Sequence, residues 1–436
     1  MNRQSKFAEF IKYAVLNIMG MLGLSCYILA DTYFVSKGLG TKGLTALNLA
    51  IPVYSFIHGS GLMLGMGGAT RYSVFRGQRS GKSGDSIFMN TVYLSVAISM
   101  LFLLTGVFFS DGLTQLLGAD TEVADMTETY LKFILLFAPA FMMNDVLICF
   151  VRNDKNPRLS MLAMLVGSLC NIVLDYVFIF PLGMGILGAV LATGAAPVIS
   201  MLLLSLHWKN GKNGFHFTWK KPELSCMFSG LPLGFPSLVA EVSSGVVMIV
   251  YNIIILKIAG NTGVAAYGVV ANLSLVVMAV YTGLAQGMQP VISTDCGKGD
   301  TESVRKVVRY GMAAMIVISL AIYLVMYGFA SGIAGIFNSE NDAALQSLAV
   351  PGIRLYFTAA PFAGFNIVIS AVFTSTQRAV PAHWISLLRG FVLIIPLAVL
   401  LSGVWGIYGI WLAFPVTEGM AAVLGAVLYR KLPNSV

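Results

Sequence analysis

Long apolar stretches separated by short polar segments run along the whole chain. Windows of about 20 apolar residues, the length that an α-helix needs to cross a bilayer, recur twelve times. They lie near residues 11–36, 45–70, 86–109, 127–150, 159–181, 186–208, 226–258, 263–292, 307–330, 346–374, 382–402 and 406–429. The pattern predicts an all-α membrane protein with twelve transmembrane helices, and it alternates far too weakly for an outer-membrane barrel.

Lysine and arginine residues are divided unequally between the two sets of loops. Of the 27, 21 lie on the side of the N-terminus, three within or at the ends of spans, and only Lys37, Lys42 and Lys257 on the other side. The positive-inside rule therefore predicts a multi-pass membrane protein with both termini in the cytoplasm.

Composition agrees with this prediction. Hydrophobic residues make up 57% of the 436 and charged residues 11%, with a mean hydropathy of +0.82. A soluble chain carries about 25% charged residues, so a soluble globule is excluded. The net charge of +8 does not indicate a nucleic-acid partner, because the basic residues alternate with spans and form no single patch. The expected surroundings are the lipid bilayer.

Three short segments recur in order in the two halves of the chain. GTKGLTA at 40–46 returns as GNTGVAA at 260–266, GLMLGM at 61–66 as GLAQGM at 283–288, and GILGAVLA at 185–192 as GIYGIWLA at 406–413. The near-constant spacing predicts two six-helix lobes, 1–208 and 226–436, joined by a cytoplasmic linker at 209–225. An even number of spans in each repeat predicts a pseudo-two-fold axis along the membrane normal.

Four polar residues in the first repeat are expected at one depth of the membrane. Asp31 and Asp175 lie a few residues before the outer ends of their spans, Asn171 is one helical turn from Asp175, and Thr193 is eight residues into the sixth span. Two carboxylates that share a low-dielectric site repel each other, so such a site takes up a proton readily. The same carboxylate, amide and hydroxyl oxygens also suit Na⁺, and residue type alone does not choose between the two ions.

The second repeat lacks these groups. At the repeat spacing, the four positions are occupied by Tyr251, Val392, Pro396 and Phe414. The scaffold therefore does not need the polar side chains to fold. A charged residue in a span is costly, so we interpret the first-repeat group as a cation-coupling site and not as a structural hydrogen-bonded pair.

These residues resemble a known family. Asp31 with the following GLGTKGLTA, FVRNDKNP at 150–157, Asn171 with Asp175, and GILGAVLAT at 185–193 are similar to the multidrug and toxic compound extrusion (MATE) family, in its prokaryotic DinF/MepA-like branch. The resemblance covers essentially the whole chain. It implies a V-shaped twelve-helix antiporter that expels lipophilic organic cations, with Asp31, Asn171, Asp175 and Thr193 matching that branch's cation site.

Other residues in the spans are candidates for a substrate cavity. Glu241 resembles an acid that many relatives carry, and it could attract a cationic substrate or pair with Arg354 or Arg389. Soft side chains such as Met63, Met66 and Met288 are suited to an adaptable cavity. His58 is interpreted as a packed residue, and Asp145 as a structural or gating contact near the cytoplasmic loop.

The predicted function is secondary active multidrug efflux, by alternating access, in exchange for H⁺ or Na⁺. The nearest alternative is a flippase of lipid-linked saccharides, which would need a cavity for an anionic headgroup. A membrane-embedded enzyme is the alternative from another class, but the sequence has no paired metal motif and no Ser/His/Asp arrangement. We expect small lipophilic cations as substrates, a monomer, and no cofactor beyond the coupling ion.

Overall fold

The computed structural model describes residues 6–78, 84–209, 211, 213–338 and 342–431, and predictions that fall on other positions lie outside the described residues. Every element in these ranges is helical. The first half contains α1 (Lys6–Gly77), α2 (Gly84–Phe108), α3 (Ser110–Leu116), α4 (Ala124–Leu136), α5 (Ala138–Asn153), α6 (Pro157–Ile179), α7 (Gly185–Leu204) and α8 (Leu206–Lys209).

The second half repeats this arrangement of long and short helices. It contains α9 (Leu224–Phe228), α10 (Leu231–Gly297), α11 (Thr301–Gly328), α12 (Ala330–Phe337), α13 (Ala343–Tyr356), α14 (Ala360–Ser375), α15 (Ala379–Leu387), α16 (Ile394–Trp405) and α17 (Ile407–Arg430). A 3₁₀ turn at Phe357–Ala359 joins α13 to α14, and a π-helical turn at Leu388–Val392 joins α15 to α16.

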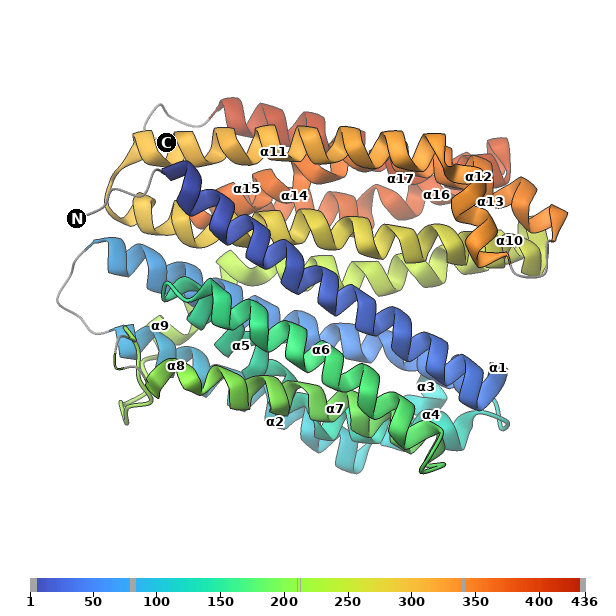
Figure 1. Ribbon diagram of the computed structural model, residues 1–436, viewed down its shortest axis with the longest axis horizontal. Helices are drawn as coiled ribbons and strands as arrows, with labels where there is room; N and C mark the ends of the chain where they lie inside the picture. Colours follow the sequence, from blue (N-terminus) through green and yellow to red (C-terminus); the bar gives the residue numbers. More distant parts are fainter. Residues whose placement is uncertain (1–5, 79–83, 210, 212, 339–341, 432–436) are drawn as a thin grey trace. The chain divides into compact units, whose positions relative to one another are not determined.

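The predicted number of transmembrane helices is confirmed. Within the described residues, nine helices are long and apolar enough to cross a membrane, and the bent pair α4 and α5 provides a tenth. Two of the nine, α1 with 72 residues and α10 with 67, are each two helices that meet at a glycine, Gly40 or Gly260. Figure 1 shows the two arms of α1, dark blue and lighter blue, running in opposite directions from the bend in that helix. Counting each arm as one span gives twelve.

The bends need glycine. Gly40 has φ 66° and ψ −157°, and Gly260 has φ 62° and ψ −159°, a conformation that is open almost only to glycine. Two further pairs with positive φ have nearly the same spacing: Gly185 with Gly406, and Lys155 with Gln377. The two halves of the chain therefore share local backbone conformation as well as sequence.

Contacts divide the chain into two compact units. The N-unit contains Met19–Val242 and Ser293–Gly299, and the C-unit contains Met1–Ile18, Ser243–Ile292 and Asp300–Val436. This division falls within α1 and α10, whereas the predicted lobes 1–208 and 226–436 end at the linker. The boundaries of the lobes stay a prediction.

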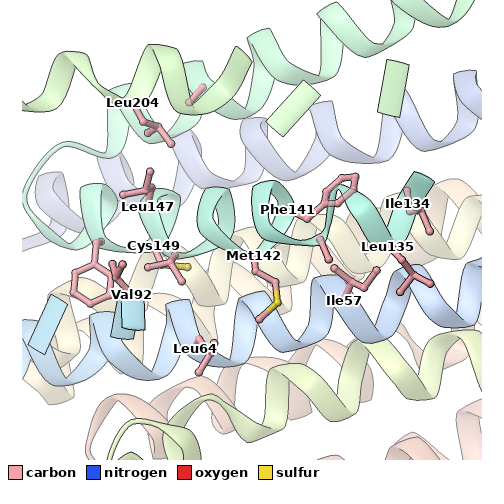
Figure 2. Close-up of a cluster of buried hydrophobic side chains, with 14 of the residues drawn as sticks. Ile57, Leu64, Val92, Ile134, Leu135, Phe141, Met142, Leu147, Cys149 and Leu204 are labelled. Carbon is pink, nitrogen blue, oxygen red and sulfur yellow. The ribbon is translucent and has the colours of Figure 1, made fainter. Parts of the chain in front are cut away.

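Apolar side chains from six helices, α1, α2, α4, α5, α6 and α7, form the core of the N-unit. Figure 2 shows side chains from α1, α2, α4, α5 and α7 in one buried cluster: Ile57, Leu64, Val92, Ile134, Leu135, Phe141, Met142, Leu147, Cys149 and Leu204. Gly65 lets α5 approach α1 closely, since a Cβ on it would lie 2.8 Å from the carbonyl oxygen of Asp145. This packing fixes the polar residues of α1 and α5 relative to each other.

The fourth span is broken between α4 and α5. The two helices meet at Phe137 at an angle of 47°, and Pro139, which has no backbone N–H, stands at the start of α5. The ring of Phe137 fills the space beside Gly194, where a Cβ would come within 2.2 Å of it. The fourth span therefore consists of two short helices, with Tyr130 on α4 and Asp145 on α5.

Candidate functional site

The helices α6 and α7 bring three of the predicted site residues together. With the Asn171 amide in the orientation that satisfies both of its groups, Nδ2 donates to Oδ2 of Asp175 at 3.1 Å. The amide oxygen then accepts from the backbone N–H of Thr193 at 3.3 Å. Asn171 and Asp175 are completely buried, and Thr193 is 5% exposed. The helical spacing of Asn171 and Asp175 thus produces a direct contact.

Asp31 of α1 completes the predicted group. It is buried, and it lies close enough to Asp175 for the two carboxylate charges to interact. Oδ1 of Asp31 and Oδ1 of Asp175 are both buried without a hydrogen-bond partner in the part of the chain that the structure describes. Buried carboxylate oxygens without partners are costly, so the site is suited to an additional cationic ligand.

Two tyrosines belong to the same neighbourhood. Tyr130 of α4 shares a side-chain hydrogen bond with Thr193 and interacts with the charges of Asp31 and Asp175. Tyr27 lies one helical turn before Asp31 and interacts with the same two carboxylates. Because Tyr27 lies four residues before Asp31, helical spacing could have predicted Tyr27 as part of the site. No spacing in the sequence predicted Tyr130.

The cluster (Asp31, Asn171, Asp175 and Thr193, with Tyr130) offers carboxylate, amide and hydroxyl oxygens in a buried setting. A proton neutralises one of two repelling carboxylates, and Na⁺ takes oxygen ligands of these types. Both ions bring the positive charge that the buried pair lacks. The residues fit either ion, so the cation-coupling role remains a prediction for this cluster.

A second polar cluster lies elsewhere in the N-unit. His58 of α1 and Asp145 of α5 are joined by a 2.9 Å contact between Nδ1 and Oδ2, so His58 is not simply a packed residue. Glu241 of α10 interacts with the charges of both. Sequence reasoning missed this association, because the three residues come from three separate spans.

The predicted cavity methionines have different surroundings. In the N-unit, Met63 and Met66 are half-buried, and the sulfur of Met66 accepts from the Arg152 guanidinium at 3.0 Å. In the C-unit, Met288 is completely buried, and its thioether packs closely against Gly311. Their role in a substrate cavity stays a prediction.

The C-unit contains a buried ion pair. Arg389 donates to Oε1 of Glu418 through Nη2 at 2.7 Å and through Nε at 3.0 Å, and Asn366 donates to Oε2 at 2.7 Å. Arg389 stands in the π-helical turn, which places its side chain out of the regular helical register. Arg354 donates to the carbonyl of Tyr327 at 3.3 Å. Both arginines considered as partners for Glu241 therefore have other partners.

The linker is anchored to the N-unit through Asp154. Oδ2 accepts from the backbone N–H of Gly214 at 2.7 Å and contacts Nε2 of His207 at 2.9 Å, while Oδ1 accepts from Tyr72 at 2.7 Å and pairs with Arg76. Burial opposes ionisation, but these contacts outweigh it and hold the pKa of Asp154 below its usual value. The ionised carboxylate thus fixes the start of the linker.

Comparisons with known proteins agree with this architecture. The sequence pattern of the MatE family matches residues 17–177 and 236–400. The "Multidrug export protein MepA" of Staphylococcus saprophyticus is 24% identical over 432 residues, covering 99% of this chain and 95% of that protein. The same-named protein of Staphylococcus aureus strain MRSA252 is 23% identical over 430 residues, with coverage of 98% and 94%.

A solved structure has the same fold. It is described as "Outward-facing conformation of a multidrug resistance MATE family transporter of the MOP superfamily", and its TM-score against this chain is 0.91. The sequences are 23% identical, and the match covers 98% of this chain and 96% of that one. The predicted fold of twelve helices in two lobes is thereby confirmed.

Proposed function

This chain belongs to the MatE family, and from that premise we propose that it is a secondary antiporter that exports lipophilic organic cations in exchange for protons or sodium ions. The relatives named as multidrug export proteins cover almost its whole length, which supports efflux as the activity. The observation that supports ion exchange is the pair Asp31 and Asp175, which is buried in two spans and forms no ion pair with a lysine or arginine among the described residues.

The geometry suggests how ion binding drives transport. A proton or sodium ion at Asp31 and Asp175 removes the repulsion between two carboxylates on α1 and α6. The arms of α1 and the pair α6 and α7 are then free to pack differently in the occupied and empty states. Since an ion shifts a conformational equilibrium only through its differential affinity, this change in repulsion is the means by which the ion gradient drives alternating access.

The alternatives have less support. A flippase for an anionic headgroup needs available cations, yet Arg389 is paired with Glu418 and Arg354 with a backbone carbonyl. An enzyme embedded in the membrane is disfavoured by family membership. We therefore retain transport of cationic small molecules as the proposal and a monomer as its unit.

The topology proposed with this function places both termini in the cytoplasm of a prokaryotic cell. A cysteine at Glu122, in a variant without the five native cysteines, should react with an impermeant reagent added outside intact cells. A cysteine at Lys155 is the control and should react only after the membrane is opened. Labelling of Lys155→Cys, but not Glu122→Cys, from outside would contradict the topology.

The experiment that tests the function is transport in everted membrane vesicles. We expect uptake of ethidium on imposing a proton gradient, a sodium gradient, or each in turn, and none without a gradient. Vesicles without the protein provide the baseline. Uptake that follows ATP addition with both gradients collapsed, or no uptake under any gradient, would overturn the proposal.

A further inference from the structure

Two glycines beside His58 make room for two acidic residues. In the segment His58-Gly59-Ser60-Gly61 of α1, a Cβ on Gly61 would lie 2.5 Å from Oδ2 of Asp145. A Cβ on Gly59 would lie 3.1 Å from Cβ of Glu241. A larger side chain at either position would push away one acid, so this segment brings α5 and α10 close to the imidazole.

The imidazole is held in a defined position. His58 and Asp145 are 13% and 7% exposed and lie 2.9 Å apart, and the ring stacks on Tyr54 at 5.8 Å with an interplanar angle of 5°. The titratable groups facing His58 are Asp145 from α5, Glu241 from α10 and Tyr54 from its own helix. Glu241 is half-buried, and no described residue donates a hydrogen bond to its carboxylate.

The charges of the cluster do not balance without a mobile cation. An imidazolium at His58 neutralises Asp145, but an ionised Glu241 would leave one uncompensated negative charge beside them. Such a charge is expensive within a bilayer. When titratable groups interact this closely, their protons belong to the group and not to a single residue. A proton on the cluster, or an organic cation next to it, supplies the missing charge.

We propose that His58, Asp145 and Glu241 form a second proton-binding site in the N-unit, which releases a proton when an organic cation binds beside Glu241. The proton passes from the cluster to water and the charge of the cation replaces it, so no other bond is made or broken. The exchange with an organic cation rests on the proposed function, whereas proton binding by the cluster does not.

A pair of tyrosines connects this site with the first one. The hydroxyl oxygens of Tyr27 and Tyr54 are 2.9 Å apart. Tyr27 interacts with the charges of Asp31, Asp175 and Asp145, whereas Tyr54 interacts with those of Asp145 and Glu241. A change of protonation at either site therefore alters the electrostatic environment of the hydrogen bond between Tyr27 and Tyr54. This gives the two sites a physical route for coupling.

Nitrogen NMR of histidine in the purified full-length protein tests proton binding directly. The chain has four histidines, so His58→Gln assigns the His58 imidazole signal unambiguously. We expect Asp145→Asn to lower the pH at which His58 gains its proton by about one unit or more, a tenfold loss of proton affinity, because the neutralising carboxylate is gone. Glu241→Gln should shift it in the same direction by less. The exposed His216 is the internal control and should not move.

Equal titration of His58 in wild type, Asp145→Asn and Glu241→Gln would overturn the proton site. If Asp145→Asn does not fold, Glu241→Gln alone decides. Saturating tetraphenylphosphonium should also lower the titration midpoint of His58 in wild type, but not in Glu241→Gln. An unchanged midpoint with the cation bound would overturn the exchange. If dialysis detects no binding of the cation at all, the proposed function fails, while the comparison with Asp145→Asn still decides the proton site.

Discussion

The two bends at Gly40 and Gly260 have the same backbone conformation, yet the residues nine positions before them differ. Before Gly40 stands Asp31, which shares a buried site with Asp175. Before Gly260 stands Tyr251, almost completely buried with its ring 5.3 Å from that of Tyr267. At this position one repeat thus has a carboxylate and the other an aromatic side chain.

The position that corresponds to Thr193 shows the same contrast. Thr193 takes part in the acidic cluster, whereas its counterpart Phe414 stacks on Tyr356 at 4.5 Å. The C-unit does bury a carboxylate, Glu418, but Arg389 forms an ion pair with it. A buried acid with its own arginine contributes to structure, and a buried pair of acids without one is suited to an exchangeable ion. The comparison supports our proposal that coupling belongs to the N-unit and structural support to the C-unit.

Removing the N-unit carboxylates should have the largest effect. We expect Asp31→Asn or Asp175→Asn to reduce gradient-driven dye efflux to the level of vesicles without the protein, because each removes a titrating charge with little change of shape. Tyr251→Phe, at the position that corresponds to Asp31, is the matched control and should retain efflux. Dye transport normalised to protein in the membrane is the measurement. Normal efflux by both Asp variants would contradict the proposed coupling role of the N-unit carboxylates.

Breaking the C-unit ion pair should affect stability and not coupling. Glu418→Gln leaves the partly buried Arg389 guanidinium without its carboxylate, which costs up to about 3–5 kcal/mol. Thermal unfolding in detergent should show a lower midpoint, and replacing both residues with leucine should restore most of it. The ion dependence of efflux per folded molecule should stay unchanged. A stable Glu418→Gln protein that has lost its ion dependence would reverse the assigned roles.

Replacing either bend glycine with alanine should destabilise the protein equally, because the two bends have the same backbone conformation. At Gly40 and Gly260 nothing lies within 4 Å of an added Cβ, so replacement with alanine changes only the backbone energy. We expect each to destabilise the protein by about 1–3 kcal/mol. Gly112→Ala, also with open space but within helix α3, should instead be neutral or stabilising. Clearly unequal costs at the two bends would show that the repeats differ in more than side chains.

The sequence predicted the spans well because twenty apolar residues in a row have few alternatives in a bilayer. It also predicted the contact between Asn171 and Asp175, because residues four apart share a helix face. It could not predict that His58 meets Asp145, or that Arg389 meets Glu418, because such contacts depend on which helix faces adjoin.

The central claim is that ion and drug compete through Asp31 and Asp175. Its most direct test is equilibrium dye binding to purified protein from acid to alkaline pH, with and without sodium. We predict that acid or sodium weakens binding to wild type and to Tyr251→Phe, and that the Asp31→Asn, Asp175→Asn double variant loses the sodium effect and most of the pH effect. The remaining pH effect should belong to the cluster of His58, Asp145 and Glu241. A double variant with the full wild-type dependence on both ions would contradict the account.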